Sequence, residues 1–354
     1  MLNYFLTLDV GTTPACGPAG NQQECRGAET ATELQRQRDK LLTALVEIDA
    51  DVLGLVELEN TPGVDPVADI VAGLNSRTAP GTFAGIASGV IGTDAIRVGI
   101  IYRPTAVVPV GAHAVLDASV DPQFDTTKNR PALAQTFQQV AGGETFTVVV
   151  NHFKSKGPCP SAADPNGDQG DGQGCWNVSR RNAAQALVSW LGTAPTGSTD
   201  ADVLILGDLN SYAREDPIAV ILAAGYVDVA DQFGDPYSYV FDGQWGTLDY
   251  ALASGSLAAQ VVGAAEHHIN ADEPSVLDYN TNFKSAGQIV SLYATDAYRT
   301  SDHDPVVVGL ALTPSPPAEI PEAPLTVLLA LSGGAVLAGG GRIAARRRRL
   351  ATPA

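Results

Sequence analysis

The most constraining feature of this sequence is a series of short apolar segments that carry polar or charged residues at one end. Patterns typical of amphipathic helices separate these segments, and this alternation predicts an α/β fold. Ligands of open α/β sheets bind at the ends of the strands, so the polar residues there are the first candidates for function. They are Glu57, His152, Asp208, Asn210, Asp249, Asp302 and His303.

The periodicity of the apolar residues also places the elements along the chain. It predicts helices at 32–48, 66–75, 180–191 and 216–224, and strands at 51–59, 97–103, 145–151, 203–207, 247–253 and 305–312. Thr32 and Gln35 have the spacing of a capping box for the first helix. The opening segment "MLNYFLTLD" reads like the interior of a strand, and the long Gly/Pro/Asp-rich loop 155–178 is expected to border a site.

Length and charge limit the classes of protein to consider. The chain has 354 residues, of which 45% are apolar, which is enough for a sizeable core. Its net charge of −18 means that its surface does not attract polyanions by bulk electrostatics. If the substrate is nucleic acid, binding therefore depends on local basic residues and on bound divalent cations.

The four cysteines fall into two local pairs, Cys16 with Cys25 and Cys159 with Cys175, each within a loop. We expect two disulfides, which suit an exported protein; four reduced thiols are the alternative. Neither pair has the C-x-x-C spacing of a zinc site.

The C-terminal part has the composition of a surface-sorting tail. A proline-rich linker at 314–324 is followed by a hydrophobic segment and a basic cluster within 325–354. This arrangement resembles the tripartite tails of bacterial surface proteins, and a plain membrane anchor is the alternative. Both interpretations predict an extracellular or cell-surface location, with the C-terminal segment contacting a membrane before any processing.

The polar residues at the strand ends together fit one chemistry. Carboxylate oxygens suit a hard cation such as Mg²⁺, and a histidine paired with a carboxylate can act as a general base. A second histidine and an asparagine can hold a phosphoryl oxygen as charge develops on it. The set therefore predicts attack of water on a phosphodiester. No G-x-S-x-G motif indicates a serine nucleophile, and no Walker motif at a strand-to-helix turn indicates a nucleotide cofactor.

In this order, "ELEN", "NHFKSKG", "GDLNSY", "LDYALAS" and "SDHDPV" resemble the endonuclease/exonuclease/phosphatase superfamily, to which deoxyribonuclease I belongs. Longer stretches such as "VLILGDLNSYAREDP" and "SYVFDGQWGTLDYALAS" resemble the ExeM/NucH-type bacterial extracellular nucleases. The resemblance covers residues 2–312. It implies that residues 1–313 form a catalytic domain with a four-layered α/β sandwich, in which two mixed β-sheets pack face to face with helices outside.

The resemblance also implies roles for individual residues. Glu57 and Asp302 would bind the metal, and His303 would be the general base, oriented by Asp249. Asp208 and Asn210 would position the water and the scissile phosphate, or help to hold a second metal. The remaining roles fall to His152, which would stabilise the phosphoryl charge or serve the leaving group, and to Arg130, which would contact a backbone phosphate.

Mg²⁺ is the expected metal, with Mn²⁺ as an alternative and Ca²⁺ as a structural or activating ion. The acidic loop that contains Asp164, Asp168 and Asp171 is a candidate Ca²⁺ site, and a solvated turn is the competing interpretation. Asp304 is interpreted as a loop residue outside the catalytic set.

The sequence departs from the family pattern at its start. The family's first strand reads like "FNVLNYF", and its first asparagine belongs to the metal site, whereas this chain begins "MLNYF". We therefore expect the first strand to be truncated, through a start placed at a valine codon that lies downstream of a signal peptide.

The expected function is a secreted or surface-anchored, metal-dependent nuclease that hydrolyses extracellular DNA, with RNA left open as a substrate. Lys154 and Lys156 offer local positive charge for a polyanion. One alternative is a phosphatase or a phospholipid phosphodiesterase of the same superfamily. A non-catalytic surface binding module is another, and metal-dependent turnover separates it from the enzymes.

Overall fold

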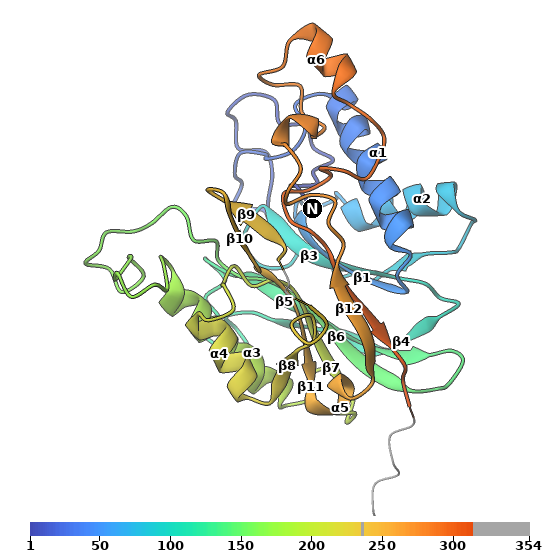
Figure 1. Cartoon of the computed structure of the whole chain (residues 1–354), viewed down its shortest axis with the longest axis vertical. Coiled ribbons are helices and arrows are strands. Elements are labelled where there is room, and N and C mark those ends of the chain that lie inside the picture. The colour runs from blue at the N-terminus through green and yellow to red at the C-terminus, as the bar shows by residue number, and fades with distance from the viewer. Residues whose placement is uncertain (235–236, 314–354) are drawn as a thin grey trace, which may run out of the picture. The chain divides into compact units, whose positions relative to one another are not determined.

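The computed structural model describes residues 1–234 and 237–313, and they form the four-layered α/β sandwich expected from the sequence (Figure 1). Two layers of strands lie in the middle, and helices cover each outer face. The predicted linker and tail, residues 314–354, lie outside the described residues. Among the residues described, no helix has the length and apolar character needed to span a membrane.

One layer is a six-stranded mixed sheet in the order β4-β5-β6-β7-β11-β8. Within it β6 and β7 run parallel, and the other neighbouring pairs run antiparallel. Its strands are β4 (Val107–Leu116), β5 (Arg130–Gln139), β6 (Thr145–His152), β7 (Val203–Asp208), β11 (Asp249–Ser254) and β8 (Tyr226–Asp228).

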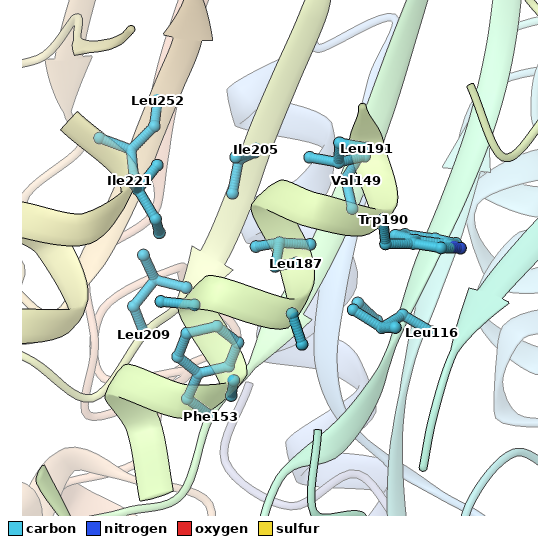
Figure 2. Close-up of a cluster of buried hydrophobic side chains, with 14 of the residues drawn as sticks. Leu116, Val149, Phe153, Leu187, Trp190, Leu191, Ile205, Leu209, Ile221 and Leu252 are labelled. Atoms are coloured by element: carbon cyan, nitrogen blue, oxygen red, sulfur yellow. The ribbon is translucent and has the colours of Figure 1, made fainter. Parts of the chain in front are cut away.

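Helices α3 (Asn177–Leu191) and α4 (Asp216–Ala223) cover the outer face of this sheet. Figure 2 shows Leu187 and Trp190 of α3 above the strands, beside Ile205 of β7 and Val149 of β6. Burial of these apolar side chains, each worth about 1.5–3 kcal/mol, holds the helices on the sheet. The packing therefore fixes the strands whose ends carry the polar residues.

The second layer has two parts. The order β1-β3-β2 forms one antiparallel sheet, from β1 (Val52–Glu59), β3 (Ile96–Tyr102) and β2 (Ala84–Gly85). The other part is the antiparallel pair β12 (Val261–Glu266) and β13 (Val306–Leu310). Helices α1 (Ala31–Ile48) and α2 (Pro66–Arg77) pack on the outer face of β1 and β3. The remaining short elements are β9 (Tyr239–Phe241), β10 (Gln244–Gly246), α5 (Gly255–Ala258), a 3₁₀ turn (Ser275–Leu277) and α6 (Ala286–Ser291).

Within the described residues, β1 and β13 are not hydrogen-bonded to each other. A cavity of about 700 Å³ is lined by residues of both strands, by Met1 and by the inner face of the six-stranded sheet. The opening residues do not form the predicted strand; Tyr4 makes a single parallel bridge to Leu58 of β1. The pairing of the opening residues with β1 is thus limited to this bridge, and the truncation of a first strand stays a prediction.

The start of the first helix also differs from the prediction. Thr30, not Thr32, is its N-cap, with extended backbone angles and a side chain that accepts a hydrogen bond from the backbone N–H of Glu33. Thr32 already lies inside the helix, where its hydroxyl cannot cap the free N–H groups of the first turn. The capping box at Thr32 and Gln35 was therefore wrong.

Both predicted disulfides are confirmed. Cys16 is bonded to Cys25, and Cys159 is bonded to Cys175. The first bond is buried against Phe5, Ala95 and Ile96. The second joins the two ends of the loop that leads from β6 into α3.

Candidate active site

Four of the predicted residues lie side by side across four neighbouring strands. In the strand register, Arg130 of β5 faces His152 of β6, His152 faces Asp208 of β7, and Asp208 faces Asp249 of β11. Successive strands are about 4.8 Å apart, so this row brings their side chains within contact distance at one edge of the sheet. The pairing of the strands therefore assembles residues that are up to 119 positions apart in the sequence.

Gly207 permits this close approach. Its φ of +119° lies outside the range that other residues adopt readily, and an added Cβ would lie 2.1 Å from the carbonyl oxygen of Asn151 on β6. The glycine that precedes Asp208 is thus required by the contact between β6 and β7. It allows His152 Nε2 and Asp208 Oδ2 to lie 3.5 Å apart.

His303, on the loop before β13, completes the row from the other layer. Its Nδ1 lies 2.6 Å from Oδ2 of Asp249, and the Ser238 hydroxyl donates to the same oxygen at 2.8 Å. The ring of Tyr239 packs 4.6 Å from the imidazole. A carboxylate on Nδ1 fixes the tautomer and leaves Nε2 as the nitrogen that is free to act on a water.

The charges around His303 favour its protonated form. Burial opposes the charge, but the Asp249 carboxylate overrides this effect and raises the pKa of His303 to about 10. Asp208 and Asp302 add to the shift. A divalent cation bound nearby would offset part of this negative charge and bring the imidazole closer to the neutral form that a general base requires.

His152 and Asp208 are both buried, and their environments shift their pKa values in opposite directions. Burial, Arg130 and His303 hold the pKa of His152 well below its usual value, so this ring is neutral at pH 7. Burial raises the pKa of Asp208 to about 7, with Asp249 contributing. Asn210 supports Asp208 by donating its backbone N–H to Oδ1 at 2.7 Å and its side-chain amide to Oδ2 at 2.8 Å.

Glu57 approaches from the end of β1, where a register irregularity between Leu55 and Leu58 interrupts the ladder. Its φ of +62° is unusual for a glutamate and re-aims the side chain at this point of the strand. Oε2 accepts a hydrogen bond from the backbone N–H of Asn3 at 2.9 Å.

The surroundings of Glu57 fit a divalent cation. Burial raises the pKa of its carboxyl, and the charge of Asp302 adds to this effect. The buried side-chain oxygen of Asn3 has no hydrogen-bond partner. Carboxylate oxygens and an unpartnered amide oxygen are hard ligands of the kind that Mg²⁺ and Mn²⁺ prefer.

Asp208, Asp249 and His303 form the one side-chain cluster with metal-site spacing within the described residues; their candidate ligand atoms lie within 4.8 Å of one another. Hydrogen bonding argues against a site made from all three, because Asp249 Oδ2 and His303 Nδ1 already bond to each other. We therefore interpret Asp249 and His303 as an acid–base pair and favour Glu57 with Asp302 as metal ligands.

Comparison with known proteins identifies the family of the chain. The model of the Endonuclease/Exonuclease/phosphatase family matches residues 22–303, most of the chain. The chain belongs to this family. Enzymes of the family are hydrolases that typically cleave phosphate esters with the help of divalent metal ions. No curated protein matches the chain significantly.

Solved structures of the family share the fold. An endonuclease/exonuclease/phosphatase family protein from Bacteroides thetaiotaomicron has 14% identity and a TM-score of 0.50, covering 77% of this chain and 88% of its own. A mannosyl-6-phosphatase from the same species has the same identity and TM-score, covering 78% of this chain and 91% of its own. TDP2 of D. rerio complexed with single-strand DNA product matches at 16% identity and a TM-score of 0.45, over 78% and 92% of the two chains. At these identities the likeness shows the fold alone.

The basic residues near the candidate active site are bonded within the protein, which leaves less positive charge for a polyanion than the sequence suggested. Lys156 Nζ lies 2.6 Å from an oxygen of the buried Glu215, which neutralises its charge. Lys154 Nζ donates to the backbone oxygens of its own loop, and burial together with Arg130 lowers its pKa to about 8. Arg130 is held by Asp94 at 3.3 Å. The pairing of Lys156 with Glu215 could not be predicted from the sequence, because Glu215 comes from a distant segment, and it reduces the local positive charge that Lys156 offers.

The acidic loop does not gather its carboxylates into a metal-type cluster. Asp164, Asp168 and Asp171 each accept a backbone N–H two residues further along, which is the bonding of a local turn. The solvated turn is therefore the better interpretation of this loop.

Several residues that support the site were not identified from the sequence. Asp304 lies in a loop as expected, but it is buried and accepts the backbone N–H groups of Ile269, Asn270 and Ala271 at 2.7–3.1 Å. Asn270 in turn donates to the carbonyl oxygen of His303 at 2.7 Å. These contacts anchor the loop of His303, and no spacing in the sequence connects the two segments.

Proposed function

We propose that this chain is an extracellular, metal-dependent nuclease that hydrolyses phosphodiester bonds of DNA, as in the ExeM/NucH-type enzymes it resembles, with RNA as the second candidate substrate. The observation that carries the proposal is the row Arg130–His152–Asp208–Asp249, closed by His303 on Asp249. It supplies an oriented imidazole beside groups suited to a phosphoryl oxygen. The two disulfides support export, because such bonds persist in oxidising compartments.

Each residue has a proposed task in the reaction. The neutral form of His303 accepts a proton from the attacking water through Nε2, while Asp249 holds the ring and stabilises the imidazolium that forms. The ring of His152 donates a hydrogen bond to a phosphoryl oxygen as negative charge develops there, and Asn210 holds the Asp208 carboxylate in place through its backbone N–H and side-chain amide. A protonated Asp208, favoured by its raised pKa, can supply a proton to the leaving oxygen.

Glu57 and Asp302 would hold Mg²⁺, with Mn²⁺ as a substitute. When bound, the cation supplies positive charge to the phosphate. Water is the proposed nucleophile, because all four cysteines are bonded in disulfides and, among the described contacts, no serine hydroxyl is hydrogen-bonded to the imidazole of His303.

The test is plasmid nicking by the purified chain with Mg²⁺ and with EDTA. The variants are His303→Gln and, as a matched control, His113→Gln on the edge strand β4. Metal-dependent nicking that is lost in His303→Gln and retained in His113→Gln supports the proposal. A folded protein that leaves DNA and RNA intact but hydrolyses p-nitrophenyl phosphate or a phospholipid contradicts it in favour of another phosphoesterase. No turnover of any phosphate ester contradicts it in favour of a binding module.

A further inference from the structure

A β-hairpin beside the site carries aromatic rings on both of its faces. Strands β9 and β10 pair antiparallel through the two-residue turn Asp242-Gly243, in which both residues have positive φ. This is the geometry of a type I′ turn, which an Asp-Gly sequence favours. The hairpin forms a two-stranded sheet of its own, labelled β9 and β10 in Figure 1.

One face of the hairpin is fixed to the body of the protein. Tyr237, just before β9, stacks on Trp245 of β10 at 5.6 Å and on His268 at 4.1 Å. His268 Nδ1 bonds to the buried Asp304 at 2.9 Å. Ser238 joins the same anchor, because its carbonyl oxygen accepts the backbone N–H of Asp304. The hairpin is thus held rigidly where it meets the catalytic loop.

The other face presents a strip of rings that begins at the catalytic histidine. The ring centroid of Tyr239 lies 4.6 Å from that of His303. The ring of Phe241, two residues further along, is nearly parallel to the Tyr239 ring, with 6.5 Å between their centroids. Phe241 is 64% exposed although it is large and apolar. Opposite Tyr239 in the hairpin, Gly246 leaves room for the ring of Tyr212.

We propose that Tyr239 and Phe241 form a stacking subsite for unpaired bases, so that the preferred substrate is single-stranded nucleic acid or a locally unpaired segment. This inference rests on the proposed function and specifies its substrate. The bases of an intact duplex hide their faces in their own stack, whereas unpaired bases can stack on protein rings. A chain of net charge −18 gains little from phosphate contacts, so stacking carries more of the binding.

The chemistry of the strip favours nucleic acid over a lipid surface. The hairpin tip carries Asp242, and Asp272 bonds to the hydroxyl of Tyr237 beside it. Insertion of the rings into a bilayer would carry these carboxylates toward its apolar interior, which is costly, whereas stacking on a base leaves them in water. The strip also runs from the ring of His303 outward, so a base on Phe241 belongs to a nucleotide near the phosphate that is cleaved.

The experiment compares steady-state hydrolysis of a 12-nucleotide single strand with hydrolysis of the same sequence as a duplex. The variants are Phe241→Ala and Phe241→Trp, with Phe283→Ala as the matched control, because Phe283 is also an exposed phenylalanine but lies before α6. We expect Phe241→Ala to raise KM for the single strand by roughly tenfold, Phe241→Trp to retain tight binding and Phe283→Ala to behave as wild type. Equal KM values in Phe241→Ala and Phe283→Ala, or an equal loss on single strand and duplex, overturn the proposal.

Binding of the fluorescein-labelled single strand in EDTA separates this proposal from the proposed function. If the wild type does not cleave nucleic acid, the proposed function fails, but weaker binding in Phe241→Ala than in Phe283→Ala still supports the subsite. Equal binding by the two variants overturns it. Binding to phosphatidylcholine vesicles that depends on Phe241, with oligonucleotide binding independent of it, also overturns it in favour of a membrane contact.

Discussion

The hydroxyl of Ser238 donates a hydrogen bond to Oδ2 of Asp249, the same oxygen that holds the imidazole of His303. Ser238 also accepts the backbone N–H groups of Leu248 and Asp249, each at 3.0 Å. The serine is buried, and its hydroxyl constrains the carboxylate that holds the histidine. It is therefore a positioning residue that does not itself touch the substrate.

Replacing Ser238 tests this role. In Ser238→Ala the Asp249 carboxylate keeps its hydrogen bond to His303 but loses the one from the serine hydroxyl. We therefore expect kcat to fall about tenfold, while KM changes little. Steady-state kinetics on a DNA substrate measure the two parameters separately. The exposed Ser256→Ala is the control. A rise in KM with unchanged kcat would show that Ser238 acts on binding instead.

Glu57→Gln removes one charge from the proposed metal site and keeps the shape of the side chain. We expect the Mg²⁺ concentration for half-maximal activity to rise at least about tenfold, because affinity for hard cations depends on ligand charge. Titration calorimetry with Mn²⁺ measures the same loss without substrate. Asp164→Asn, in the acidic loop, serves as control. An equal effect of both substitutions would argue against a metal at Glu57.

Gly207→Ala should destabilise the protein by about 3 kcal/mol or more, because the new methyl group collides with the backbone of β6 and the residue has a strained φ. Activity should fall with it, since His152 and Asp208 move apart. Gly225→Ala is a control in which φ is also positive but no atom lies within 4 Å. Urea denaturation measures the free energy of unfolding of each variant. Equal losses in the two variants would show that the clash is not the cause.

The stability of the protein should depend on pH through Lys154. Burial and nearby guanidinium groups lower its folded-state pKa to about 8, from an ordinary value of 10.5. Between these values the unfolded chain binds more protons, so the free energy of unfolding of the wild type rises with pH relative to Lys154→Met. Urea denaturation at about pH 7.5 and pH 10 measures this difference, with substitution of the exposed Arg214 by Met as control, because an arginine stays charged over this range. A difference that stays constant or falls contradicts the shifted pKa.

Among the described residues, β1 and β13 are not paired with each other, and the cavity lined by both strands has room for one more strand between them. Tyr4 already pairs parallel to β1, so a strand joined ahead of Leu2 would run along this edge. We expect a chain in which Phe-Asn-Val and three preceding strand-forming residues replace Met1 to show a Tm a few degrees higher, which corresponds to about 1–2 kcal/mol. An extension of equal length made of Gly and Ser is the control. Equal Tm values for the two chains would contradict the pairing of an added strand with β1.

The sequence predicted most strands and helices near the site, because long apolar runs and periodic patterns depend on local burial. It did not predict β4 and β5, whose polar residues interrupt the apolar pattern, or the short hairpin β9–β10. The structure gathers all of the predicted site residues, although their individual roles stay predictions. Glu215 beside Lys156, and Ser238 beside Asp249, could not be foreseen, since such pairings join segments far apart in the chain.

The sequence by itself determined the chemical inventory of this protein: its carboxylates, histidines and asparagine at strand ends, its local cysteine pairs and its family. Only the tertiary structure decided how those groups act together. The register of β5, β6, β7 and β11 sets the row from Arg130 to Asp249, and the burial of that row shifts the pKa values of His152 and Asp208 in opposite directions. Both effects depend on distances between remote segments and on exclusion of water, which arise only when the two layers pack.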